Sequence, residues 1–226
     1  MSRRFGLAGL LLFAFALFAV PAAEAQTASQ DVMAHAVQTV NDLKRDPAFG
    51  NAQRLIQRAR GVMIVPRLYK AGFFIGGSGG EGVLSVRRGP GTWSDPAFFY
   101  IASASFGLQI GAQQSEMMLI ALTQRGLNAL LTNGFKFGAT ADIAVAMLGS
   151  SAEAATTTNA GADIVVWAST AGAYAGLTIN GSIIKPSPDH DKGYYGRPVT
   201  TRQILSGEVR APGSATRLRD DLASIG

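Results

Sequence analysis

The residues most typical of an active site lie in a short glycine-rich segment. Residues 76–82 read Gly-Gly-Ser-Gly-Gly-Glu-Gly, which matches both a dinucleotide-binding loop and the turn that carries the nucleophilic serine of hydrolases, here Ser78. Either function requires a helix directly after the glycines. Residues 83–86 instead read Val-Leu-Ser-Val, which is a strand pattern. We therefore predict a turn between two strands and no cofactor, and a hydrolase that uses Ser78 and His190 stays an alternative.

A second possible chemistry is metal binding at Asp189-His190-Asp191, which offers two carboxylates and one imidazole. Because Pro188 precedes them, these residues are more typical of a solvated, turn-rich loop over residues 189–196, and a metal ion there stays an open alternative. The chain contains no cysteine, which excludes a thiol nucleophile, a thiolate metal site and an iron–sulfur cluster. No glutamates pair in a way that indicates acid–base catalysis. We predict that the protein is not an enzyme.

The positive charge of the chain is concentrated in one segment. Seven basic residues and one acidic residue lie between Lys44 and Lys70, so that this segment carries a net charge of +6, whereas the whole chain carries +5. Arg54 and Arg58 are four residues apart, beside an apolar stripe that contains Leu55 and Ile56. Such a helix can place its apolar side at a lipid interface while its arginines bind phosphates.

This segment is the predicted lipid-binding site. Its residues are Arg54, Arg58, Arg60, Arg67, Lys70, Leu55 and Ile56. The alternative is that Phe49, Leu55 and Ile56 pack on the sheet and the arginines are only solvated. Nucleic acid is not an expected partner, because few aromatic residues are interleaved with the basic ones and the chain is predicted to be exported.

The first 25 residues are predicted to be a secretory signal. Arg3 and Arg4 precede an uncharged run over residues 5–20, and Ala23-Glu24-Ala25 places small residues at the two positions that a signal peptidase reads. The run is short for a helix that spans a bilayer, which needs about 20 apolar residues. We expect cleavage after Ala25 and a periplasmic or secreted protein, either soluble or peripherally associated with a membrane.

Residues 26–226 are predicted to form one α+β domain, a mainly antiparallel sheet or barrel-like core with helices at its N-terminal end and a short C-terminal helix. Charged residues make up only 15% of the chain and glycines number 27, which is typical of a compact β-rich body. Helices are expected from Ser29 as cap to about Arg45, from Asp46-Pro47 to just before Gly61, and over residues 124–131 and 217–225. Strands are expected at residues 62–65, 73–75, 83–87, 98–104, 106–112, 117–123, 164–169, 174–178 and 182–185.

Several segments, in this order, resemble the SYLF family of lipid-binding domains. They include Ala-Arg-Gly-Val-Met-Ile-Val-Pro at 59–66, Lys-Ala-Gly-Phe-Phe-Ile-Gly-Gly at 70–77, Gly-Thr-Trp-Ser-Asp-Pro-Ala-Phe at 91–98, Ser-Phe-Gly-Leu-Gln-Ile-Gly at 105–111, the segment 174–184 and Tyr-Tyr-Gly at 194–196. The resemblance covers about residues 30–208. It differs from the family pattern at residues 146–151, where the usual glycine-rich stretch lacks its proline and basic residue.

The resemblance implies a non-enzymatic module that binds acidic lipids, and phosphoinositides in eukaryotic members, through a basic amphipathic segment. On this chain that segment holds Arg54, Arg58, Arg60, Arg67 and Lys70. Some eukaryotic members also bind actin, which an exported protein is not expected to meet. We therefore expect an anionic phospholipid surface as the partner, and a structural or protein-interaction module of the bacterial cell envelope is the alternative.

Overall fold

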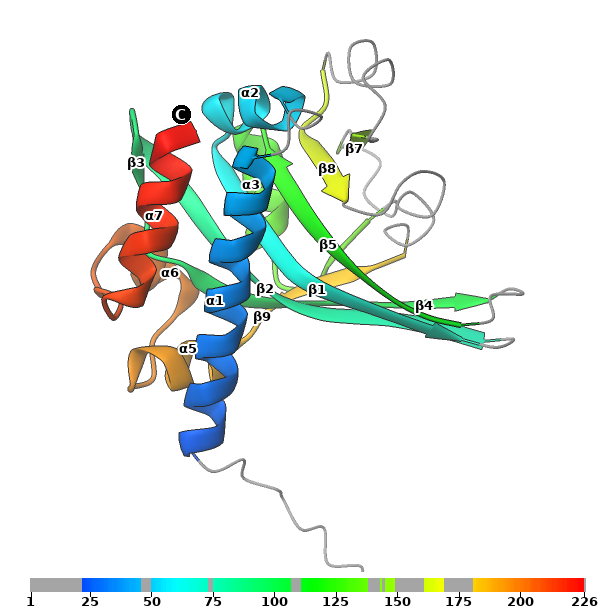
Figure 1. The fold of residues 1–226 in the computed structure, drawn as a ribbon, viewed down its shortest axis with the longest axis horizontal. Helices are drawn as coiled ribbons and strands as arrows, with labels where there is room; N and C mark the ends of the chain where they lie inside the picture. The colour runs from blue at the N-terminus through cyan, green and yellow to red at the C-terminus, as the bar shows by residue number, and fades with distance from the viewer. Residues whose placement is uncertain are drawn as a thin grey trace, which may run out of the picture.

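A strongly curved sheet with helices on both faces forms the protein, as the computed structural model shows (Figure 1). The structure describes residues 22–45, 50–72, 75–106, 111–137, 143, 145–148, 161–168 and 181–225. Within them eight of the nine strands follow the order β6-β9-β4-β2-β1-β5-β8-β7, and the ninth, β3, pairs with β2. The pairs are antiparallel except for β7 and β8, which are parallel. The predicted α+β class with a mainly antiparallel sheet is confirmed.

The strands are β1 (Gly61–Gly72), β2 (Ile75–Gly89), β3 (Thr92–Trp93), β4 (Ala97–Phe106), β5 (Gly111–Ala121), β6 (Phe135–Lys136), β7 (Val145–Leu148), β8 (Ile164–Ala168) and β9 (Ile183–Pro186). The helices are α1 (Ala22–Arg45), α2 (Gly50–Arg58), α3 (Gln124–Leu131), α5 (Pro188–Tyr195), α6 (Thr201–Ser206) and α7 (Ser214–Ile225). None of the helices in the described ranges is both long and apolar enough to cross a membrane.

One face of the sheet is covered by α1, which packs along it together with α5 and α7 (Figure 1). The predicted apolar stripe of α1 is confirmed, because Val32, Ala36, Val40 and Leu43 are all buried. The predicted cap at Ser29 is wrong. The helix begins at Ala22, and the Ser29 hydroxyl lies inside it, 2.8 Å from the carbonyl oxygen four residues earlier, a bond that serines make within helices.

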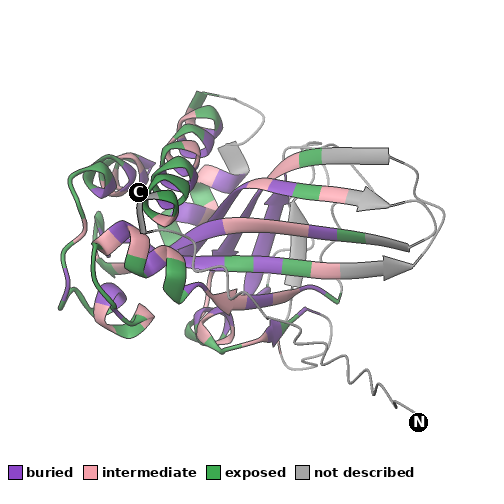
Figure 2. Ribbon diagram, turned by 90° about the horizontal axis from the view of Figure 1, so that it is seen from below, coloured by how far each residue is buried: buried purple, intermediate pink, exposed green. Residues whose placement is uncertain are grey.

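The opposite face of the sheet holds a second apolar cluster, covered by α3 and α6. Side chains alternate along a strand, so that Val62 and Ile64 of β1 face the helical layer with α1 while Met63 and Val65 face this second cluster. Burial is greatest where the helices gather (Figure 2). Strands that are buried on both faces explain why residues 62–65 form a continuous apolar run.

The glycine-rich segment is part of a strand, and the turn predicted there is wrong. β2 continues through all of it, and its pairing with β1 has an irregular register between Ile64 and Arg67. A Cβ atom at Gly80 would lie 2.5 Å from the Arg67 carbonyl oxygen, and one at Gly82 would lie 2.4 Å from that of Ile64. The glycines are therefore needed for close backbone approach, as is usual for glycine within a sheet.

The C-terminal part contains more helix than the sequence pattern predicts. Residues 189–196 were expected to be a loop, but α5 occupies most of them, with Pro188 at its first turn and Gly196 ending it at a φ of 70°. A capping box of Thr200 and Gln203 begins the unpredicted α6. The predicted helix at 124–131 is confirmed, and the last helix begins at Ser214. The strand expected at 174–178 and most of the predicted signal lie outside the described residues.

Candidate functional site

The predicted basic helix exists as α2, and its two sides are clearly different. Arg54 and Arg58 are exposed on it. Ile56 is fully buried and Leu55 is partly buried against the same apolar cluster. The apolar side of α2 therefore packs on the protein core, as the alternative reading of the sequence has it. In this conformation Ile56 is not available for the lipid contact that the sequence predicts for it.

Contacts with β2 and α7 fix the position of α2. Arg87 of β2 donates from Nη2 to the Ile56 carbonyl at 2.8 Å and from Nε to the Ala59 carbonyl at 3.0 Å. A cation at this end stabilises the helix, because the carbonyls of the last turn lack partners within it. The guanidinium of Arg87 also lies 4.4 Å from the centre of the Trp93 ring. Gln57 of α2 donates to the Ile225 carbonyl at 2.9 Å, which joins α2 to the end of α7.

Three of the predicted cations lie at one end of the protein. Arg54 and Arg58 are on α2, and Arg60 follows directly in the short connection to β1, where it too is exposed. Among the described carboxylates, none pairs with Arg58 or Arg60. These two guanidinium groups can therefore bind an external anion without first breaking an ion pair.

Arg67 and Lys70 lie farther along β1. Arg67 comes seven positions after Arg60, and at about 3.3 Å per residue this places them roughly 20 Å apart. Arg67 forms an ion pair with Asp31 of α1. The five basic residues do not form one continuous surface. Asp31 is 36 residues away from Arg67 in the chain, so the spacing of the basic residues does not reveal this pair.

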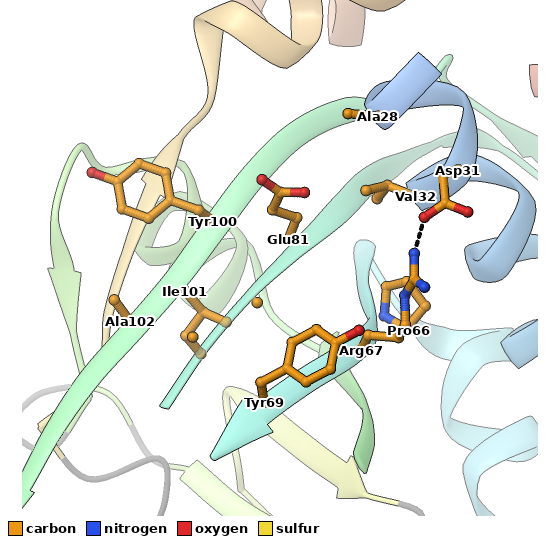
Figure 3. Close-up of a pocket in the computed structure, with 12 residues that line it drawn as sticks. Ala28, Asp31, Val32, Pro66, Arg67, Tyr69, Glu81, Tyr100, Ile101 and Ala102 are labelled. Atoms are coloured by element: carbon orange, nitrogen blue, oxygen red, sulfur yellow. Dashed lines mark hydrogen bonds and ion pairs between the residues drawn. The ribbon is translucent and has the colours of Figure 1, made fainter. Parts of the chain in front are cut away.

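Arg67 lies instead at the side of an open groove of about 560 Å³ between α1 and the strands β1, β2 and β4 (Figure 3). Among its lining residues are Asp31, Arg67, Tyr69, Gly79, Glu81 and Tyr100. Tyr69 and Tyr100 are the two large apolar side chains of the described residues that are exposed, by 52% and 38%. The residue pattern does not predict this groove, because Tyr69 and Tyr100 come near each other only through the pairing of β1, β2 and β4.

The candidate catalytic and metal-binding residues point to different partners. Ser78 Oγ lies 2.6 Å from Ser103 Oγ on β4, while His190 Nε2 lies 3.4 Å from Glu81. Asp191 is buried and accepts a hydrogen bond from the Phe98 amide at 2.8 Å, and burial raises its pKa to about 7. Among the described residues, no three imidazole or carboxylate groups are gathered as a metal ion requires.

Comparison with known proteins identifies the family of this chain. The family described as "Ysc84: Las17-binding protein actin regulator" matches residues 102–225, which is more than half of the chain. The chain belongs to the Ysc84 family. This confirms the resemblance to SYLF domains, since both names denote the same family.

Several members of the Ysc84 family are similar to this chain over most of its length. LAS seventeen-binding protein 3 of Saccharomyces cerevisiae is 32% identical over 75% of this chain and 38% of its own, and Protein YSC84 of the same species is 31% identical over 78% and 39%. SH3 domain-containing YSC84-like protein 1 of Rattus norvegicus is 28% identical over 76% and 50%. The chain spans between about 40% and half of the length of these relatives.

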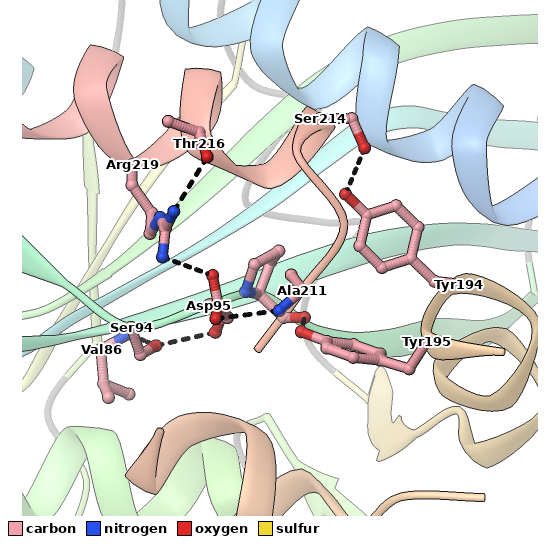
Figure 4. A network of polar contacts seen from close by, with 10 residues as sticks. Val86, Ser94, Asp95, Tyr194, Tyr195, Ala211, Ser214, Thr216 and Arg219 are labelled. Atoms are coloured by element: carbon pink, nitrogen blue, oxygen red, sulfur yellow. Dashed lines mark hydrogen bonds and ion pairs between the residues drawn. The ribbon is translucent and has the colours of Figure 1, made fainter. Parts of the chain in front are cut away.

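The Ysc84-like motif at residues 91–98 has a structural role on this chain. Asp95 accepts a hydrogen bond from the Ala211 amide at 3.1 Å and forms an ion pair of 2.8 Å with Arg219 of α7 (Figure 4). The Ser94 hydroxyl accepts from the Val86 amide, and the Tyr195 hydroxyl donates to the Pro96 carbonyl at 2.9 Å. The motif therefore joins β2, α5 and α7.

Proposed function

We propose that this protein is a non-enzymatic module that binds anionic phospholipid, with phosphoinositide-like head groups, through the exposed arginines Arg54, Arg58 and Arg60. The observation that carries the proposal is the exposure of Arg54 and Arg58 on a helix that Arg87 and Gln57 hold in place, and of Arg60 just after it. Neither Arg58 nor Arg60 is paired with a described carboxylate. Membership of the Ysc84 family supports a binding module, because the family description and the name of LAS seventeen-binding protein 3 both refer to binding.

The mode of binding follows from which side of α2 is buried. Each basic residue near an anionic surface contributes about 1 kcal/mol, so three arginines give weak binding that salt screens. Since Ile56 is buried in the core, no apolar insertion adds to this attraction. The contact is therefore made with head groups, and Arg67 takes no part in it while it is paired with Asp31.

Flotation with vesicles tests this proposal. The protein is mixed with vesicles that contain phosphatidylglycerol or a phosphatidylinositol phosphate, and with neutral phosphatidylcholine vesicles. We expect recovery with the anionic vesicles at low salt, and at least a fivefold loss for Arg58→Glu combined with Arg60→Glu. Equal recovery on neutral and anionic vesicles, or no effect of the double variant, would overturn the proposal.

The matched control is Arg197→Glu combined with Arg202→Glu. Both residues are exposed in the C-terminal part, before and within α6, so that the control changes the net charge by the same amount at a different place. We expect this control to float like the unchanged protein. A loss equal to that of the α2 variant would show that only the total charge matters and would contradict a defined site.

A second candidate function is a structural or protein-interaction module of the cell envelope. The description of the Ysc84 family as a Las17-binding actin regulator favours it, because that description names protein binding. Actin itself is not the partner that we propose, because the proposed export would separate the chain from it. A partner recovered from envelope extracts by both the unchanged protein and the Arg58→Glu, Arg60→Glu variant would support this candidate over lipid binding.

The location of the protein is part of the same proposal. The predicted signal at residues 1–25 supports export to the periplasm or the medium, where anionic phospholipid is available at the membrane surface. Cell fractionation followed by mass spectrometry of the mature N-terminus checks this. A cytoplasmic protein that keeps residues 1–25 would contradict it.

A further inference from the structure

The floor of the groove is built from two rows of side chains that cross β1, β2 and β4. In the first row Arg67 pairs with Glu81, which pairs with Tyr100. In the second, Tyr69 pairs with Gly79, which pairs with Ala102. Side chains opposite each other in an antiparallel pair lie on the same face, so both tyrosines and Glu81 face the groove. Figure 3 shows Glu81 between Tyr100 on one side and Tyr69 with Arg67 on the other.

The floor between the two tyrosines is open because Gly79 has no side chain. A Cβ atom there would meet nothing closer than the Ile101 carbonyl oxygen at 3.8 Å, which is an ordinary contact. This distinguishes Gly79 from Gly80 and Gly82, where a Cβ atom would collide with the backbone of β1. The fold therefore requires glycine at positions 80 and 82, whereas glycine at position 79 keeps space on the surface.

The groove carries a net negative charge. Arg67 and Asp31 neutralise each other, which leaves Glu81 as the remaining charged side chain among the lining residues. The Glu81 side chain is 44% exposed, and the described contact of its carboxylate is with His190 Nε2 at 3.4 Å. Apart from Arg67, which is paired with Asp31, the next cation in register is Lys185 of β9, opposite Tyr100, and its Cε lies near Gly134 at the other side of β9. The carboxylate is thus accessible from solvent.

We propose that this groove binds the alkylammonium group of a small soluble compound. An exposed carboxylate supplies the opposite charge, and the faces of two tyrosines attract a cation through their ring electrons. The open floor at Gly79 accommodates a group as bulky as trimethylammonium. A soluble compound fits better than a lipid, because the groove lies roughly 20 Å along β1 from the arginines proposed to meet the membrane.

A titration with choline tests the proposal. Choline is compared with 3,3-dimethyl-1-butanol, which has the same shape and no charge, and binding is followed by the amide NMR signals of Gly79 and Gly80. We expect saturable shifts with choline and none with the neutral compound. Equal shifts with both compounds, or no saturable shift with choline, would overturn the proposal.

Three substitutions assign the effect to this groove. Glu81→Gln keeps the size of the side chain and should weaken choline binding about three- to tenfold, as should Tyr100→Leu. Gly79→Val should abolish binding by filling the floor, and its melting temperature shows whether it still folds. Should Gly79→Val fail to fold, Glu81→Gln alone decides. Choline affinity unchanged in Glu81→Gln would overturn the assignment.

This inference is separate from the proposed function, because it rests on different residues. Glu81→Gln should leave flotation on anionic vesicles unchanged, and Arg58→Glu with Arg60→Glu should leave choline binding unchanged. Flotation on phosphatidylcholine vesicles that is lost in Glu81→Gln would show that the ammonium belongs to a lipid head group and would overturn the choice of a soluble compound.

Discussion

A single buried carboxylate makes the stability of this protein depend on pH. Asp191 is 1% exposed, and its described partner is the Phe98 amide. Burial raises its pKa from 3.8 to about 7, so that between about pH 4 and pH 7 the folded protein binds more protons than the unfolded chain. Stability therefore decreases as the pH rises through this window and becomes level above it.

Asp191→Asn should remove this dependence. An asparagine can accept the same hydrogen bond from the Phe98 amide without a charge. We expect the free energy of unfolding of the unchanged protein to fall by on the order of 2 kcal/mol between pH 5 and pH 8, and that of the variant not to show this fall. Urea unfolding at both pH values measures the difference. Asp189→Asn, an exposed change two residues away, is the control, and an equal gain in this control would contradict the assignment to Asp191.

Local spacing along the chain predicts the position of some residues of the site and not of others. The spacing of Arg54, Arg58 and Arg60 was enough to predict that they lie together, because a helix and its end are local features. The same reasoning joined Arg67 to them, although its ion pair with Asp31 depends on how α1 packs across β1. Contacts between distant segments follow from tertiary packing, which spacing along the chain does not encode.

At the scale of elements, the pairing of β1 with β2 depends on glycines that have no local function. The residue types predicted a turn, since glycine is most often a turn residue. These glycines instead allow the backbones of β1 and β2 to approach closely near Pro66, where the register is irregular, and this is evident only from the pairing of the two strands. By contrast, the elements set by their own periodicity, such as the stripe of α1 and the helix α3, were predicted correctly.

Gly82→Ala should therefore destabilise the protein by about 3 kcal/mol, because the new methyl group has to displace the backbone of β1. Gly89→Ala is the matched control in the same strand, since nothing lies within 4 Å of its Cβ position. We expect the control to change stability by less than about 0.5 kcal/mol. Chemical denaturation of both variants measures this, and equal effects would mean that close packing at Gly82 is not the cause.

At the scale of the whole molecule, α7 packs against both α1 and α2. Ala215, Leu218, Leu222 and Ile225 are buried in the layer that α1 and the sheet share. Lys44 near the end of α1 forms an ion pair of 3.2 Å with Asp221 of α7. Gln57 of α2 donates a hydrogen bond to the carbonyl of Ile225 in α7. The helix that carries the proposed lipid-binding arginines thus rests on the C-terminal helix, so the position of α7 influences that site.

Asp95→Ala tests this connection. The substitution leaves the Ala211 amide and the Arg219 guanidinium without their acceptor, and it should lower the free energy of unfolding by about 2 kcal/mol. Because α7 depends on this contact and α3 lies on the opposite face of the sheet, hydrogen exchange should increase in α7 more than in α3. Asp220→Ala, at an exposed position of α7, is the control and should leave exchange unchanged. Uniformly faster exchange in all helices would mean that Asp95 supports the fold as a whole and does not specifically hold α7.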